Sequence, residues 1–105
     1  MSGLTQAAQD LADEFALLPD WEERVAYLID LGKTLAPLRD DERNEDTRVR
    51  GCVSRVWLVC DTRTEDPEKL YFRGDSDAHL VRGEIALLLR VFSGRTPAEI
   101  VAADP

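Results

Sequence analysis

The sequence predicts one α+β domain, with helices at both ends of the chain and a small antiparallel sheet between them. Apolar residues recur every three or four positions in the first and last thirds, which is the spacing of amphipathic helices. Between about residues 47 and 73 they alternate with polar residues, which is the spacing of strands. A length of 105 residues favours a single domain.

Two helices are expected before the sheet. The first spans about Gly3 to Leu18 and is followed by a proline that ends it. Asp20 is placed to cap the second helix, with Glu23 in the position of a capping box. Gly32 is expected to end that helix in the left-handed conformation. The almost wholly polar residues 39–47 are then predicted to form a surface loop.

Three strands are expected in the middle of the chain. They are predicted at Thr47–Arg50, Ser54–Asp61 and Lys69–Arg73. Within the second strand, Val56, Leu58 and Cys60 share one face. We therefore predict that Cys60 lies in the core.

A third helix follows the sheet. Asp75, Ser76 and Asp77 precede it, and their side chains suit the positive N-terminus of a helix, so we expect them to cap it. Gly83 lies inside the helix at a cost of about 1 kcal/mol relative to alanine, which predicts a close approach to a strand. The apolar stripe of the helix consists of Val81, Ile85, Leu88 and Phe92.

The charge of the chain restricts its partners. It has 21 acidic and 13 basic residues, a net charge of -8, which argues against binding to nucleic acids or to anionic membranes and favours a partner with a basic surface. No segment approaches the ~20 apolar residues of a membrane helix. The first 13 residues lack the features of a signal peptide, so a cytoplasmic protein is expected.

Cys52 is the candidate reactive residue. Arg48, Arg50 and Arg55 surround it in an otherwise acidic chain, and nearby positive charge favours the nucleophilic thiolate. Gly51 permits a tight loop that presents the thiol at its tip. The alternative is a small hydrophobic side chain packed at the end of a strand.

Other candidate sites are weaker. His79, the one histidine, is expected at the surface, and Asp75 and Asp77 are explained more simply as helix caps than as an acid–base pair. The two cysteines do not make a disulfide framework. Cysteine and histidine number three in total, whereas a structural zinc site takes about four ligands. We expect no metal and no cofactor.

Three motifs follow one another along the chain: Asp20–Arg24 with Tyr27–Lys33; Val49–Leu58; and Gly74–Ala78 with Val81–Gly83 and Ser93–Ile100. In this order they resemble the SufE/CsdE family, and Val49–Leu58 is similar to the family's active-site segment Gly-Cys-x-Ser-x-Val-Trp. The likeness runs from about Phe15 to Pro105, and the three motifs together make it specific.

This resemblance implies a sulfur-transfer accessory protein rather than an enzyme. In the family, a cysteine accepts persulfide sulfur from a pyridoxal-phosphate cysteine desulfurase, stimulates that enzyme and passes the sulfur on for iron–sulfur cluster assembly. By position Cys52 is that acceptor. Seven residues are expected to support its loop or bind partners: Arg50, Gly51, Ser54, Arg55, Asp75, Ser76 and Asp77.

The implied fold is a SufE/IscU-like antiparallel sheet with helices packed on one side. IscU scaffolds bind their cluster or metal through three cysteines, and this chain has two, so a carrier is expected rather than a scaffold. SufE chains continue past the position of Pro105 into further helices. Residues 1–105 are therefore expected to form a C-terminally shortened domain with an incompletely covered third helix.

Two other functions compete with sulfur transfer. An acidic interaction adaptor without thiol chemistry predicts that Cys52→Ser changes nothing. A thiol peroxidase predicts that peroxide oxidises Cys52 to a sulfenic acid, with turnover in the absence of a desulfurase.

Overall fold

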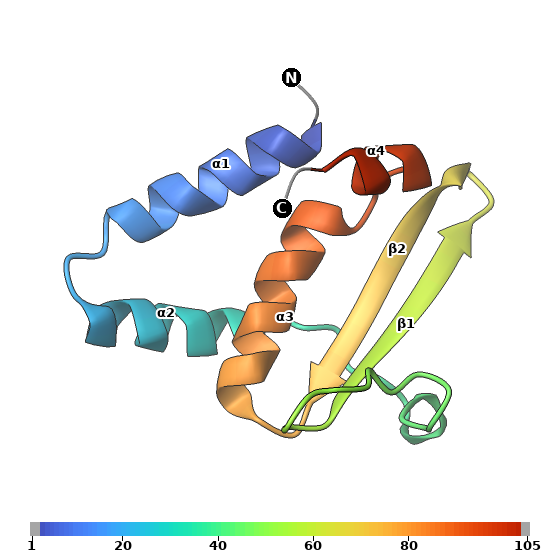
Figure 1. The fold of residues 1–105 in the computed structure, drawn as a ribbon, viewed down its shortest axis with the longest axis horizontal. Coiled ribbons are helices and arrows are strands. Elements are labelled where there is room, and N and C mark those ends of the chain that lie inside the picture. The colour runs from blue at the N-terminus through green and yellow to red at the C-terminus, as the bar shows by residue number, and fades with distance from the viewer. Residues whose placement is uncertain (1–2, 104–105) are drawn as a thin grey trace.

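The computed structural model describes residues 3–103 and confirms the α+β class (Figure 1). The expected domain limits, residues 1 and 105, lie outside the described part. In chain order the elements are α1 (Gly3–Ala16), α2 (Trp21–Gly32), a short 3₁₀ helix η1 (Asp40–Glu42), β1 (Val56–Arg63), β2 (Asp66–Ser76), α3 (His79–Phe92) and α4 (Pro97–Ala102). None of the helices in this range is long and apolar enough to cross a membrane.

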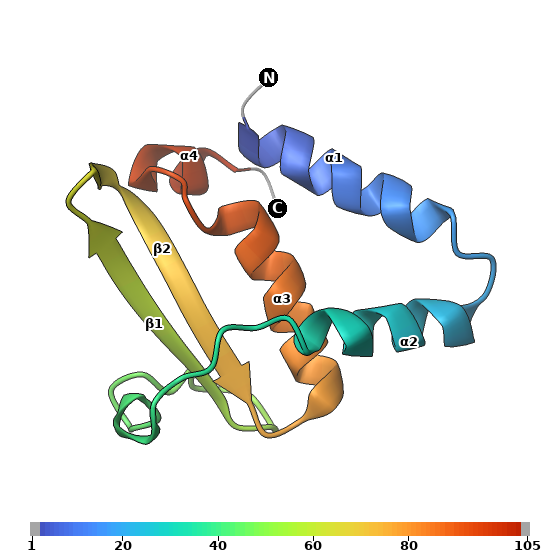
Figure 2. The same cartoon turned by 180° about the vertical axis from the view of Figure 1, so that it is seen from behind.

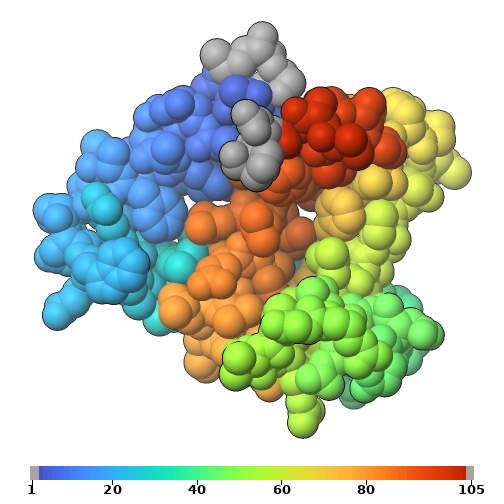
Figure 3. Space-filling model, in the orientation of Figure 1, coloured from blue at the N-terminus to red at the C-terminus, as the bar shows by residue number. Residues whose placement is uncertain are grey.

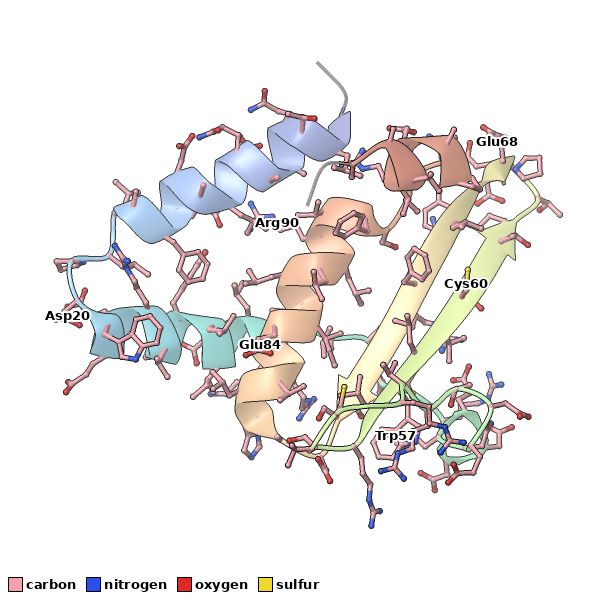
Figure 4. All side chains as sticks on the ribbon, in the orientation of Figure 1. Asp20, Trp57, Cys60, Glu68, Glu84 and Arg90 are labelled. Carbon is pink, nitrogen blue, oxygen red and sulfur yellow. The ribbon has the colours of Figure 1, made fainter. Side chains whose placement is uncertain are left out.

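Helix α3 is the centre of the fold. It packs against β2 on one side and against α1 and α2 on the other, as Figures 1 and 2 show from opposite directions. An ion pair of 2.6 Å between Arg90 Nη2 and Glu14 Oε1 joins α3 to α1, and Figure 4 shows Arg90 between the two helices. Hydrogen bonds from this guanidinium lower the pKa of Glu14.

The helix ends follow the local sequence signals in most places. Asp20 Oδ1 accepts from the backbone N–H of Glu23 at 2.8 Å, which confirms the cap of α2. Thr96 and Glu99 form the capping box of α4. Gly94 takes a positive φ of 78° after α3, as a terminating glycine does.

Gly32 and Gly83 serve close packing between helices. Gly32 does not adopt the left-handed conformation; a side-chain carbon there would lie 2.7 Å from the backbone nitrogen of Gly83. A side-chain carbon at Gly83 would overlap the carbonyl group of Leu28. The expectation that Gly83 approaches a strand is therefore wrong, because its close neighbour is α2.

Within residues 3–103 the sheet has two strands, not the expected three. β1 and β2 are antiparallel, with Val56 opposite Ser76 and Cys60 opposite Phe72. The expected strand Thr47–Arg50 is reduced to one isolated bridge between Arg48 and Trp57. Two backbone hydrogen bonds of 2.8 Å flank that bridge, and the chain then turns away at Gly51.

The polar segment before the sheet is anchored rather than merely exposed. Leu38 and Glu42 are both buried, and the Thr47 hydroxyl donates to the carbonyl oxygen of Glu42 at 2.6 Å. The guanidinium of Arg73, on β2, bonds both Glu42 and Asp61. This segment therefore fixes the position from which the chain enters the Cys52 region.

Candidate functional site

Cys52 lies on an exposed loop between the Arg48 bridge and β1. We call residues 50–55 the Cys52 loop. Arg50 and Gly51 form a turn at its start, and the φ of Gly51 is 85°, a conformation that favours glycine. A side-chain carbon at Gly51 would meet no atom within 4 Å, so it is the backbone conformation that calls for glycine.

The far end of the Cys52 loop is held through one residue, Arg55. Its backbone N–H donates to Asp77 Oδ1 at 3.1 Å. Its carbonyl oxygen accepts from the Ser76 hydroxyl at 2.6 Å and from the Asp77 N–H at 3.3 Å. Both backbone polar groups of Arg55 are thus satisfied by the turn between β2 and α3.

The tip of the loop has no comparable anchors. Within residues 3–103, the side chains of Cys52, Val53 and Ser54 make no hydrogen bond or ion pair, and Val53 is fully exposed. Ser54, expected to support the loop, therefore makes no such contact through its side chain. The result is a free tip on a fixed base.

The expectation that Asp75, Ser76 and Asp77 cap α3 is wrong. The N-cap residue is Ala78, and no side chain caps it. Ser76 and Asp77 bind Arg55 instead. Asp75 forms ion pairs with two arginines, Arg43 at 2.9 Å and Arg82 at 3.1 Å. These longer-range partners satisfy the polar side chains that local sequence rules assign to the helix.

The positive charge around Cys52 is smaller than the sequence indicates. Arg50 pairs with Glu45 at 3.0 Å, and Arg48 lies 4.0 Å from the same carboxylate. Arg55 has no ion pair among the described residues. Glu45 was not among the predicted site residues, although its position three residues before Arg48 is the signal that could have identified it.

Cys52 also lines an apolar groove of about 540 Å³ between α3 and the sheet. Figure 3 shows the surface hollowed between these elements. Among the described residues that line it, one is charged: Glu84, labelled on α3 in Figure 4. The other lining residues are Val49, Val56, Leu58, Phe72, Val81, Ile85, Leu88, Leu89, Phe92 and Ile100. The predicted helix stripe and the candidate nucleophile thus meet at one surface.

Cys60 is exposed, so its predicted place in the core is wrong. It lies on β1, where Figure 4 labels it, and it is opposite Phe72 in the sheet register. Helix α3 packs mainly on β2, so the face of β1 that carries Leu58 and Cys60 is poorly covered. Leu58, on that face, is 40% exposed. Alternation therefore assigned the face correctly, but no element covers it at Cys60.

No group of three or more His, Cys, Asp or Glu side chains in residues 3–103 is arranged to hold a metal ion. His79 is exposed at the first residue of α3. What the site presents is an accessible thiol beside an apolar surface.

Residues 9–105 match the model of a family described as SufE, an Fe–S metabolism associated domain. An uncharacterized SufE-like protein of Rhizobium etli is 47% identical over 96 residues, which are 90% of this chain and 64% of that protein. A second SufE-like protein, from Rhizobium meliloti, is 45% identical over 96 residues, 90% of this chain and 68% of that protein. The sulfur acceptor protein CsdE of Escherichia coli is 39% identical over 103 residues, 98% of this chain and 69% of that protein. The chain thus spans about two thirds of the length of these relatives.

Proposed function

This chain belongs to the SufE family, and we propose that its Cys52 accepts sulfur from a cysteine desulfurase and carries it toward iron–sulfur cluster assembly. The observation that carries the proposal is the exposed thiol of Cys52 on a free tip with an anchored base. Such a loop can enter a partner's active site while the rest of the domain stays outside it.

The reaction is a thiol exchange. The Cys52 thiolate attacks the outer sulfur of the desulfurase persulfide, and a new S–S bond forms as the old one breaks. The desulfurase thiolate leaves with the electron pair, so the sulfur changes carrier without net oxidation. The desulfurase is then free for another cycle, and we propose that its turnover rises for this reason. Attack by a thiolate of an iron–sulfur scaffold would later remove the sulfur from Cys52 in the same way.

The surroundings of Cys52 support this chemistry in two respects. Arg55 follows Cys52 by three residues and has no ion pair in the described part of the chain, so no acidic neighbour neutralises its charge. The adjoining apolar groove offers a surface against which a loaded cysteine can be withdrawn from water. Pyridoxal phosphate belongs to the desulfurase, and nothing in the proposed step calls for a cofactor or metal on this chain. We propose that the reaction takes place in the cytoplasm, where thiols stay reduced.

Desulfurase turnover with and without this chain tests the proposal. We expect the chain to raise the release of sulfide from cysteine in the presence of a reductant. Cys52→Ser should abolish the increase, and Cys60→Ser, which removes the other exposed thiol, should leave it unchanged. Full stimulation by Cys52→Ser would favour the acidic adaptor instead. Peroxide turnover by the chain alone would favour the thiol peroxidase.

A further inference from the structure

Transfer of sulfur between two proteins depends on how the acceptor loop is aimed, because reacting atoms must meet at about 3–3.5 Å with the correct alignment. The Cys52 loop is fixed at its start by the Arg48 bridge to β1. Its end is fixed by contacts to a turn that lies more than 20 residues later in the chain. The side chains that form these contacts are therefore candidates for controlling the direction of the thiol.

We propose that Ser76 and Asp77 form a clasp on the backbone of Arg55 and act as positioning residues for Cys52. This inference rests on the proposed sulfur transfer and assigns a role within it. The clasp consists of three hydrogen bonds: Arg55 N–H to Asp77 Oδ1, Ser76 hydroxyl to Arg55 carbonyl, and Asp77 N–H to the same carbonyl. All three converge on one residue, three positions after the thiol.

The residues of the clasp are held in place by the sheet and by their neighbours. Ser76 is buried at the end of β2 and lies opposite Val56 in the sheet register. Its hydroxyl also accepts from the backbone N–H of Ala78 at 3.2 Å, and its own N–H donates to Asp75 at 2.8 Å. Asp75 is held in turn by its two arginine partners. The position of Arg55 is therefore set by the sheet and by α3.

A role in helix capping does not account for these side chains. The N-cap residue of α3 is Ala78, and no side chain within residues 3–103 caps the helix. Ser76 and Asp77 bind Arg55 although the helix lies next to them and although both are residue types that commonly cap helices. Both side chains bond the backbone of Arg55, and neither caps α3.

The test compares four variants of the full chain. Ser76→Ala removes the hydroxyl, and Asp77→Ala removes the acceptor of the Arg55 N–H. Asp77→Asn is the conservative variant, because the amide oxygen still accepts that hydrogen bond. Asp46→Ala is the matched control: it removes an exposed carboxylate whose oxygens make no hydrogen bond or ion pair in the described residues.

Three rates are measured for each variant. They are sulfur transfer from a persulfide-loaded desulfurase to Cys52, alkylation of Cys52 and Cys60 by iodoacetamide, and hydrogen exchange at the Arg55 amide. Loss of a hydrogen bond to a charged group corresponds to a change of about tenfold or more in the rate or equilibrium constant that depends on it. We expect Asp77→Ala to slow sulfur transfer by about tenfold and Ser76→Ala, which removes a bond between neutral groups, by about fivefold, and we expect Asp77→Ala to speed exchange at Arg55 by about tenfold.

Alkylation distinguishes a change in the orientation of the Cys52 thiol from a change in its reactivity. A small reagent reaches an exposed thiol from any direction, so alkylation of Cys52 should stay unchanged in all four variants, as should that of Cys60. Asp77→Asn and Asp46→Ala should transfer sulfur at the wild-type rate. Wild-type transfer by both Asp77→Ala and Ser76→Ala would overturn the clasp, as would slower alkylation of Cys52.

The clasp and the proposed function fail in different ways. If the wild-type chain accepts no sulfur from the desulfurase, the proposed function is wrong, and hydrogen exchange at Arg55 still decides whether the clasp exists. If the wild type accepts sulfur and both alanine variants accept it equally fast, sulfur transfer stands and the clasp has no role in it.

Discussion

The guanidinium of Arg73 donates hydrogen bonds to both carboxylate oxygens of Glu42, which is buried in an otherwise polar segment. Hydrogen bonds from Arg73, and next the backbone N–H of Arg39, lower the pKa of Glu42 to about 2, from an ordinary value of 4.5. This contact ties the segment before the Cys52 loop to β2.

Glu42 should give the fold an acid-sensitive contribution to stability. Because its pKa is lowered in the folded state, the contribution is full above pH 4.5 and disappears as the pH falls from 4.5 toward 2. We expect Glu42→Gln to lower the melting temperature by several degrees at pH 7 and to have little effect near pH 2. Thermal unfolding followed by circular dichroism measures this. Asp30→Asn, which breaks an exposed pair with Lys33, is the control and should change little at either pH. An equal loss for Glu42→Gln at both pH values would contradict the assignment.

Gly83 should not tolerate even a methyl group. Alanine stabilises an exposed helix by about 1 kcal/mol relative to glycine. At Gly83 the added carbon would overlap the Leu28 carbonyl, so Gly83→Ala should instead destabilise the chain by about 1–3 kcal/mol. Urea unfolding gives the difference, and a stabilised Gly83→Ala variant would show that α2 and α3 do not pack this closely.

The apolar groove beside Cys52 should bind a hydrophobic dye. Leu88 lines it and is 56% exposed, and exposed apolar surface of this kind favours dye binding, self-association or low stability. Leu88→Glu should lower the dye fluorescence. Leu80→Glu is a matched control, because Leu80 is 41% exposed on the same helix but does not line the groove. A monomer that binds no dye and melts like an ordinary stable domain would show that the groove is closed in solution.

Charge near Cys52 should affect partner binding more than charge elsewhere. Affinity for the desulfurase should fall as salt rises, because exposed charges are screened over about 10 Å at 0.1 M. Arg55→Glu should weaken binding more than Lys33→Glu, which makes the same change of charge at the C-terminal end of α2. Titration at two salt concentrations measures both effects. Equal losses for the two variants would indicate that the overall charge of -8, and not a local interface, governs binding.

Local sequence signals predicted the helices well because those signals act over a few residues. The predicted Asp20 cap, for example, depends on Glu23, three positions later. The sequence motif also indicates Cys52 as the candidate thiol, and in the structure Cys52 is exposed.

The failures involve partners far apart in the chain. Periodicity assigned Cys60 to the correct face of β1 but could not show that α3 covers β2 instead. Capping rules predicted that Ser76 caps α3, whereas its hydroxyl donates to the carbonyl oxygen of Arg55, 21 residues earlier. The expected strand Thr47–Arg50 is only an isolated bridge, because alternation does not reveal that the turn at Gly51 ends the pairing.

The position of the transferred sulfur tests the central claim most directly. The chain is incubated with a cysteine desulfurase and cysteine, digested without reductant, and its peptides are analysed by mass spectrometry. We predict one added sulfur atom on the Cys52 peptide, removable by dithiothreitol, and none on the Cys60 peptide, although both thiols are exposed. An adduct found mainly on Cys60, or equally on both cysteines, would contradict the assignment of Cys52 as the acceptor.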